Sequence, residues 1–291
     1  MSVPRLSVIL PAKNEAQNLE SLLPRLKSMA ARLGCEVEII VVDDGSTDRT
    51  REVCAAHAVR VHSHPYSCGN GAAVKSGARV ASGEVLAFMD ADGQHDPALI
   101  PGLLAKLEEG YDMVVGARTA ADHAGAHRLA ANRFYNAFAS WMVGRPVADL
   151  TSGLRVARAE RFRRFLYLLP NGFSYPTTST MAFFRCGYPV AYVPISVDRR
   201  TGRSHIRLLR DGLRFLLIIF KIGTLYSPLK LFVPISAAFF MTGLGYYVYT
   251  YLSAHRFTNM SALLFITAVL VFVVGLLSEQ ITLLNFKDSD K

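Results

Sequence analysis

The first 118 residues alternate between short apolar runs and longer segments in which apolar residues recur every three or four positions. Short β-branched runs are typical of buried strands, and the longer spacing is typical of helices that cover a sheet. The pattern predicts strands at 6–10, 37–42, 60–62, 84–89 and 112–115. It predicts helices at 15–33, 46–57, 71–80 and 97–108. Strands that alternate with helices in this way form a mostly parallel sheet covered on both faces, which is an α/β fold.

The pattern is weaker after residue 118. It predicts a helix at 128–143, a basic helix at 157–169 and a strand at 188–197. From residue 206 the character changes, because four cations fall on one face of a helix and leucines fill the rest: Arg207, Arg210, Arg214 and Lys221. A cationic stripe beside apolar residues predicts an amphipathic helix at a membrane surface. The alternative is a core helix with a solvated basic edge.

Two long apolar stretches follow, at 231–253 and 261–284. At about 1.5 Å per residue, each is long enough to cross about 30 Å of hydrocarbon. Two crossings place both ends on one side, and three lysines flank that side: Lys221, Lys230 and Lys287. The loop between the stretches carries Arg256 alone, so the positive-inside rule places both ends in the cytosol.

The sequence therefore divides into three parts. We expect a cytosolic catalytic domain at 1–204, an amphipathic interfacial helical segment at 205–229, and a two-helix transmembrane anchor with a short cytosolic tail at 230–291. Glu279 lies inside the second apolar stretch, where it could line an acceptor path, form an ion pair or reach toward the interface.

The positive charge is concentrated in one block. The chain has a net charge of +9, a hydrophobic content of 51% and a mean hydropathy of +0.24. Between residues 155 and 230, 14 lysines and arginines face three acidic residues. A basic block beside two membrane spans favours anionic lipid headgroups or a phosphate-bearing substrate. Nucleic acid is the competing interpretation, but it does not explain why the block adjoins the spans.

The N-terminus shows no signal-peptide pattern, and the four cysteines form no C-x-x-C pair. Both observations favour a catalytic part in the cytosol.

The strongest chemical signal is Asp90-Ala91-Asp92-Gly93-Gln94, directly after an apolar strand. Two carboxylates at this spacing can face one hard cation, and a divalent ion there would bridge a diphosphate. The alternative is a turn whose carboxylates cap the helix that begins near Pro97.

Two further loops follow strands in the same way. One is Asp43-Asp44-Gly45-Ser46, whose carboxylates can accept hydrogen bonds from a base or ribose. The other is the segment 11–15, which follows the first strand. Ligands of parallel sheets bind beyond the carboxyl ends of strands, so the three loops outline a nucleotide pocket. A dinucleotide fingerprint is excluded at Gly69-Asn70-Gly71, because the third glycine position holds Val74.

In order along the chain stand the blocks VILPAKNEAQNL, IIVVDDGSTDRT, VLAFMDADGQHDP, DMVVGAR, DLTSGLRV and RRTGRSHIRLLRDGLRF. With these blocks and the two apolar stretches after them, the chain resembles the family 2 glycosyltransferases. Within that family it is similar to the dolichol-phosphate mannose synthase and undecaprenyl-phosphate glycosyltransferase group. The resemblance spans nearly the whole chain and implies a GT-A type, Rossmann-like catalytic domain.

The resemblance also implies site residues. It implies nucleotide contacts at Pro11, Ala12, Asn14, Glu15, Asp43, Asp44, Asp90 and Arg199. It implies a Mg²⁺ or Mn²⁺ site at Asp90, Asp92 and Gln94, with Asp92 nearest the diphosphate and Arg118 facing the donor. It implies a phosphate-binding role for Arg133, an acceptor-side loop containing Ser152, and a mobile basic loop that contains Arg203. Members of the group often have lysine after the serine of that basic loop, where this chain has His205.

The implied enzyme is a metal-dependent, inverting hexosyltransferase. It would transfer a sugar from a UDP- or GDP-linked donor to undecaprenyl or dolichyl phosphate. We expect a multi-pass protein of the cell inner membrane, or of an endoplasmic-reticulum-type membrane in a eukaryote, with no nucleic-acid partner and with homo-oligomerisation left open. Two alternatives are a processive membrane polysaccharide synthase and a non-catalytic, nucleotide-binding membrane scaffold. The sequence lacks the Q-x-x-R-W motif that is typical of processive synthases, which argues against the first alternative. The intact Asp90, Asp92 and Gln94 argue against the second.

Overall fold

The computed structural model describes residues 6–118, 126–172, 174–196, 220–221 and 223–287, with side chains omitted at 126–132 and 285. The chain forms two compact units, 1–140 with 145–203, and 141–144 with 204–291. Each unit is considered by itself below.

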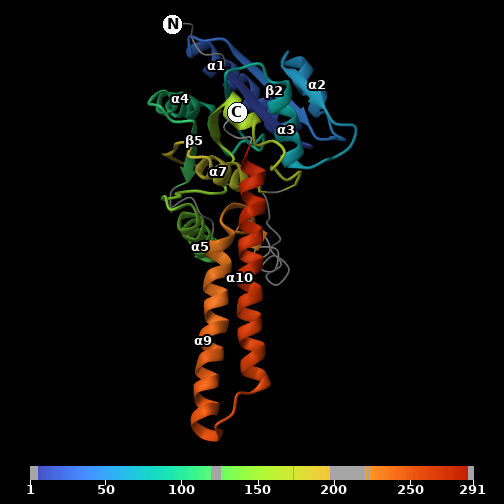
Figure 1. The fold of residues 1–291 in the computed structure, drawn as a ribbon. Helices are drawn as coiled ribbons and strands as arrows, with labels where there is room; N and C mark the ends of the chain where they lie inside the picture. Colours follow the sequence, from blue (N-terminus) through green and yellow to red (C-terminus); the bar gives the residue numbers. More distant parts are fainter. Residues whose placement is uncertain (1–5, 119–125, 173, 197–219, 222, 288–291) are drawn as a thin grey trace. The chain divides into compact units, whose positions relative to one another are not determined.

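The first unit is built on a seven-stranded sheet in the order β3-β2-β1-β4-β6-β5-β7 (Figure 1). The strands are β1 (Leu6–Ala12), β2 (Val37–Asp43), β3 (Arg60–Ser63), β4 (Val85–Phe88), β5 (Met113–Arg118), β6 (Arg155–Arg158) and β7 (Val190–Ile195). β1, β2, β3 and β4 are parallel to one another, and β5 is parallel to β7. β6 lies between β4 and β5 and is antiparallel to both. The predicted α/β fold with a mostly parallel sheet is confirmed.

The helices that begin in this unit follow or precede these strands along the chain. They are α1 (Ala16–Arg32), α2 (Thr50–Ala56), α3 (Asn70–Val80), the 3₁₀ turn η1 (Pro97–Leu99), α4 (Ile100–Glu108), α5 (Ala126–Val143), α6 (Ala159–Arg163) and α7 (Tyr175–Arg185). α1 shows why the pattern succeeds, because the residues it buries recur at helical spacing from Leu19 to Met29. α3 lies very close to β1, since a Cβ added at Gly77 would lie 2.4 Å from Ile9 Cγ2.

The parallel strands end at one edge of the sheet. Ala12 of β1 is in register with Asp43 of β2, and β4 ends beside β1, where the amide of Met89 donates to the carbonyl of Ile9. The loops after β1, β2 and β4 therefore meet at the carboxyl edge of the sheet, where ligands of α/β folds bind.

One prediction about the region after residue 118 was wrong, and one helix was missed. Residues 157 and 158 belong to the strand β6 and not to a basic helix, and the helix α6 that follows ends at Arg163. The helix α7 was not predicted at all. Its first half is rich in serine and threonine, which have low helix propensity in isolation, and here their hydroxyls are buried and hydrogen-bonded.

The second unit contains a helical hairpin, α9 (Pro228–Ala254) and α10 (Asn259–Phe286), which lie side by side (Figure 1). By length and composition, both helices could cross a membrane. They pack closely where glycine removes a side chain, because a Cβ at Gly275 would lie 2.7 Å from the Cβ of Phe232. The hydroxyl of Ser236 also donates to the carbonyl of Ala268 at 2.8 Å. The predicted pair of apolar helices is confirmed, whereas most of the predicted interfacial segment at 205–229 lies outside the described residues.

Candidate active site

The loop after β4 carries Asp90 and Asp92, both half-buried. Gly93 has a φ of 74°, a left-handed conformation that glycine adopts readily, and Asp92 Oδ1 accepts a hydrogen bond from the amide of Gln94 at 3.2 Å. The backbone of Gly153 lies against Asp90, since a Cβ at position 153 would lie 2.2 Å from Asp90 Oδ2. Asp90 can therefore occupy this position only because residue 153 has no side chain.

Arg118, at the end of β5, is fixed by a carboxylate that the sequence did not single out. Its Nε donates to Asp149 Oδ2 at 2.8 Å, and its Nη2 donates to Asp149 Oδ1 at 3.0 Å. Nη2 also donates to Thr151 Oγ1 at 2.5 Å. Burial raises the pKa of Asp149, but the hydrogen bonds and charge of Arg118 outweigh this and lower it. This two-pronged ion pair fixes the plane of the guanidinium.

His95, three residues after Asp92, is buried. Burial lowers its pKa, Asp92 and Asp149 act the other way, and Arg118 lowers it further. Its Nδ1 has no hydrogen-bond partner among the described residues. His95 thus brings an unsatisfied polar atom to the side of Asp92 and Arg118.

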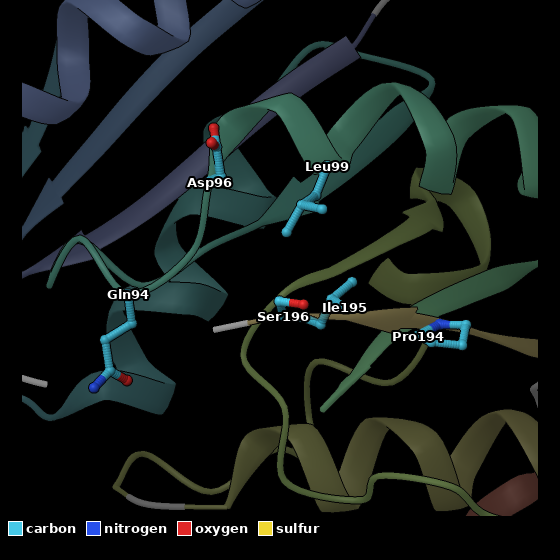
Figure 2. Close-up of a pocket in the computed structure, with 6 residues that line it drawn as sticks. All are labelled: Gln94, Asp96, Leu99, Pro194, Ile195 and Ser196. Atoms are coloured by element: carbon cyan, nitrogen blue, oxygen red, sulfur yellow. The ribbon is translucent and has the colours of Figure 1, made fainter. Parts of the chain in front are cut away.

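The residues of this loop fit a divalent cation. Two carboxylates on a tight turn supply the oxygen ligands that Mg²⁺ and Mn²⁺ prefer. Gln94, the third predicted ligand, lines a cavity of about 390 Å³ with Asp96, Leu99, Pro194, Ile195 and Ser196 (Figure 2). The cavity joins the loop after β4 to the end of β7.

The predicted nucleotide loops are locked to each other. The amide of Asn14 donates to Ser46 Oγ at 2.9 Å, and Asn14 Oδ1 accepts from the amide of Thr47 at 2.8 Å. Asn14 has a φ of 56°, which asparagine tolerates better than most residues. The neighbouring amide of Glu15 donates to Thr50 Oγ1 at 3.1 Å. The loops after β1 and β2 therefore form one rigid surface.

The two aspartates after β2 have different surroundings. Asp43 is fully buried, accepts from the amide of Ser46 at 2.9 Å, and pairs with Arg51 Nε at 2.7 Å. Its backbone lies in register with Ala12, while Pro11 is buried one residue earlier in β1. Both carboxylate oxygens of Asp43 are therefore engaged within the chain, and its contact with a nucleotide stays a prediction.

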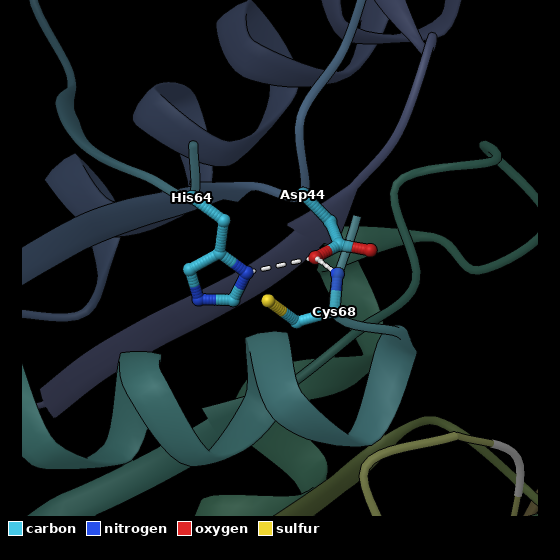
Figure 3. A group of neighbouring side chains, drawn as sticks. All are labelled: Asp44, His64 and Cys68. Atoms are coloured by element: carbon cyan, nitrogen blue, oxygen red, sulfur yellow. Dashed lines mark hydrogen bonds and ion pairs between the residues drawn. The ribbon is translucent and has the colours of Figure 1, made fainter. Parts of the chain in front are cut away.

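Asp44 lies on the other side of the same loop and holds the segment that follows β3. Its Oδ1 lies 2.7 Å from His64 Nδ1 and accepts from the amide of Cys68, while its Oδ2 accepts from Ser67 and Gly69. The side chains of Asp44, His64 and Cys68 lie close enough together to hold one metal ion (Figure 3). However, His64 Nε2 also lies 2.9 Å from Ser76 Oγ, so the carboxylate and the imidazole already have partners. The geometry favours a hydrogen-bonded clasp.

The glycine-rich start of α3 packs against the backbone of residues 170–172. The amides of Gly71 and Ala72 donate to the carbonyls of Gly172 and Asn171, at 3.1 and 2.8 Å. A Cβ at Gly71 would lie 2.0 Å from the carbonyl oxygen of Pro170. The amides at this helix start therefore already have acceptors within the chain. The close approach of the segment 170–172 accounts for the glycine at position 71, so no bound phosphate is needed to explain it.

The other predicted site residues are placed differently. Arg133 is exposed on α5, and Ser152 is buried, with a hydroxyl that has no partner among the described residues. Arg199, Arg203 and His205 lie outside the described residues. Beyond the predicted set, the site brings in Asp149 and His95, which a sequence pattern gives no reason to choose over other polar residues.

The fold and this site define an α/β protein with polar loops at the carboxyl edge of its parallel strands, and comparison with known proteins gives its family. Residues 7–185 match the family described as glycosyl transferase family 2, and residues 227–284 match the one described as GtrB C-terminal hairpin. The chain belongs to glycosyl transferase family 2, as its sequence blocks predicted.

Two curated relatives are similar over part of the chain. The dolichol-phosphate mannosyltransferase of Pyrococcus furiosus is 41% identical over 118 residues, which cover 39% of this chain and 33% of that protein. The undecaprenyl-phosphate 4-deoxy-4-formamido-L-arabinose transferase of Photorhabdus laumondii is 33% identical over 162 residues, 54% of this chain and 50% of that protein. The matches thus span a third to a half of these relatives.

Among solved structures, the chain is similar to glucosyl-3-phosphoglycerate synthase from Mycobacterium tuberculosis. The complex of that enzyme with Mn²⁺, UDP-glucose and phosphoglyceric acid has a TM-score of 0.60 and 26% identity, covering 76% of this chain and 79% of that one. Mannosyl-3-phosphoglycerate synthase from Rubrobacter xylanophilus, at 22% identity and a TM-score of 0.55, shares the fold.

Proposed function

We propose that this protein transfers a sugar from a nucleotide-diphospho-sugar to a polyprenyl phosphate, with inversion at the anomeric carbon. The observation that carries the proposal is the combination, in one chain, of a family 2 catalytic domain with a hairpin of two apolar helices. A water-soluble acceptor would not require such a hairpin, whereas a long-chain lipid phosphate would bring its phosphate to the membrane surface. The names of the two curated relatives support the same class of acceptor.

The donor is proposed to bind at the carboxyl edge of β1, β2 and β4. Asp43 would contact the base or ribose, together with the loop 11–15. Asp90, Asp92 and Gln94 would hold Mg²⁺ or Mn²⁺, in line with the Mn²⁺ and UDP-glucose complex of the structural neighbour. When bound, this cation would neutralise charge on the departing nucleoside diphosphate.

The residues of the chain then have three tasks. Asp149 fixes Arg118 so that the guanidinium can stabilise developing charge without reorganisation. The interlocked loops at Asn14 and Ser46 keep the donor in one orientation. A lipid phosphate is already ionised near neutral pH, so alignment matters more than a general base. The basic segment that contains Arg199 and Arg203, and the exposed Arg133, are proposed to bind the acceptor and donor phosphates.

The membrane arrangement belongs to the same proposal. The catalytic domain at 1–204 would lie in the cytosol, the segment at 205–229 at the interface, and the hairpin at 230–291 in the bilayer. The cell inner membrane would be the site of action in a bacterium. The donor nucleotide would be UDP or GDP.

The test uses the full chain, purified in detergent, with a panel of UDP- and GDP-sugars. Acceptors are undecaprenyl phosphate, dolichyl phosphate and, as a soluble comparison, 3-phosphoglycerate. We expect nucleoside diphosphate release and a lipid-linked sugar that mass spectrometry identifies, with 3-phosphoglycerate inactive. Transfer to 3-phosphoglycerate but to neither lipid would overturn the proposal, and the Asp92→Asn variant controls for contaminating activity.

A further inference from the structure

Arg155, the first residue of β6, is fully buried in the centre of the sheet. Its Cα partners in the neighbouring strands are Phe88 of β4 and Val115 of β5. Phe88 comes two residues before Asp90, and Val115 comes three residues before Arg118. Arg155 therefore lies in the strand that separates the two predicted donor-binding groups.

The hydrogen bonds of Arg155 join two segments of backbone. Nη2 donates to the carbonyl of Ser152 at 2.5 Å, and Nη1 donates to the carbonyl of Pro176 at 2.8 Å. Nη1 also lies 2.8 Å from Ser179 Oγ and 3.1 Å from Thr180 Oγ1. One guanidinium thus ties the loop 149–153 to the first turns of α7.

This loop is the part of the chain that orients the donor-facing groups. Asp149 and Thr151 hold Arg118, and Gly153 lies against the carboxylate of Asp90. The start of α7 grips the loop a second time, because the hydroxyl of Tyr175 donates to the carbonyl of Gly153 at 3.3 Å. A shift of this loop would therefore move Arg118 directly.

A neutral core residue would be the simpler choice at this position. The acceptors that Arg155 uses are all neutral, and a buried cation costs free energy unless it is well compensated. Burial lowers the pKa of Arg155, and Tyr175, Tyr192, Asp149 and Asp90 act the other way. Burial is the larger effect, so a cation at this position is kept at a cost in free energy.

We propose that Arg155 is a positioning residue: it holds the loop 149–153 in place and, through Asp149, sets the orientation of Arg118. The proposal rests on the proposed function, because Arg118 is taken to face the donor diphosphate. Lysine at this position would keep the positive charge but could not reach Ser152 and Pro176 at once. The substitution Arg155→Lys therefore tests the positioning role of the side chain separately from its charge.

The test is a double-mutant cycle in the full chain, with Arg155→Lys, Arg118→Ala and both together. Arg155→Lys alone should lower kcat about 30-fold with little change in the donor KM, because a misplaced Arg118 stabilises the transition state poorly. In the Arg118→Ala background the same change should cost less than about threefold. If the two losses multiply, Arg155 does not act through Arg118 and the proposal is wrong.

A matched control comes from Arg163, which donates to the carbonyls of Ala78 and Ala81 at 2.9 and 2.6 Å. Arg163→Lys should leave kcat unchanged in both backgrounds. If Arg155→Lys fails to fold, Thr180→Val removes one acceptor of the guanidinium and should show a smaller loss with the same dependence on Arg118.

The cycle can also be measured on the Kd of UDP and of GDP with Mn²⁺, which needs no acceptor. A free nucleoside diphosphate carries the negative charge that the donor develops only in the transition state, so this Kd should rise in Arg155→Lys even though the donor KM does not. A wild-type chain that binds nucleotide but glycosylates no lipid would refute the proposed function alone. Non-additive changes in that Kd would then support the role of Arg155, and additive changes would refute it.

Discussion

Gly153 and Asp90 lie in contact across the sheet, with no space between them for even a methyl group. Replacing Gly153 with Ala should therefore displace the Asp90 carboxylate or the loop that carries Gly153. A displacement of about 1 Å in such a site can lower activity about 100-fold. We expect a loss of this size in kcat, measured with the preferred donor and acceptor.

The control for this prediction is Gly102→Ala on α4, where an added Cβ meets nothing within 4 Å. Alanine is also the better helix former, so this variant should keep its activity and unfold no more easily than the wild type. Full activity of Gly153→Ala would show that Asp90 is not positioned by this contact.

The second prediction concerns the cation. Asp92→Asn keeps the size of the side chain and removes its charge, so turnover should fall at least about 100-fold, as when electrostatic stabilisation of a leaving group is lost. EDTA should abolish wild-type activity, and Mg²⁺ or Mn²⁺ should restore it. Turnover that persists in EDTA would remove the metal from the mechanism.

The third prediction concerns Asp149. Asp149→Asn would remove the charge that pairs with Arg118 and weaken the two hydrogen bonds that orient its guanidinium, so kcat should fall about 10- to 100-fold while the chain still folds. Asp112→Asn is the matched control, because Asp112 pairs with Arg158 at the other end of β6. Equal losses in the two variants would mean that the effect is one of general stability.

The fourth prediction is a pH dependence of stability. Burial raises the pKa of Asp44, but its hydrogen bonds with His64, Ser67, Cys68 and Gly69 outweigh this and lower it from 3.8 to about 2. A carboxyl whose pKa is lower in the folded state stabilises the fold above its unfolded pKa, and this contribution is lost as the pH falls through its folded pKa. The contribution is about 2 kcal/mol above pH 4.

Unfolding of the full chain in detergent at pH 6 and at pH 3 measures this contribution. The wild type should lose more stability between the two values than Asp44→Asn does. Glu20→Gln, which changes an exposed carboxylate on α1, should behave like the wild type. An identical pH dependence for Asp44→Asn and wild type would contradict the clasp described above.

The fifth prediction concerns the hairpin. Leucine at Gly275 would collide with Phe232 and force α9 and α10 apart, whereas leucine at Gly245 meets nothing within 4 Å. Cysteines introduced at Ser236 and Ala268 should be joined by a short thiol cross-linker in membranes. The yield should fall with Gly275→Leu and persist with Gly245→Leu.

The sequence predicts the first half of the fold well, because there each apolar run ends at a turn signal and each helix buries one stripe. It fails at β6, where arginines at both ends of a four-residue strand read as a basic helix. Arg155 is buried there among four hydrogen-bond acceptors. One is the nearby carbonyl of Ser152, and the other three belong to the unpredicted α7, at Pro176, Ser179 and Thr180.

The same reason limits the predicted site. The Asp90 loop can be found because its residues are consecutive, and it lies at the sheet edge where the pattern placed it. Asp149 becomes notable only once the fold brings it to Arg118, 31 residues away. Asp44 shows the opposite case, because its neighbour Asp43 has the same sequence context and only the structure shows which of the two holds the loop after β3.

The sheet order has a consequence for how the chain is synthesised. β5 and β7 join β4 only through β6, a strand that leaves the ribosome after both β4 and β5. Until residue 158 has emerged, β4 presents an unpaired edge, and an exposed edge invites pairing with another nascent chain. Translation that pauses before β6 has emerged should therefore yield more aggregated protein than translation that pauses after β6.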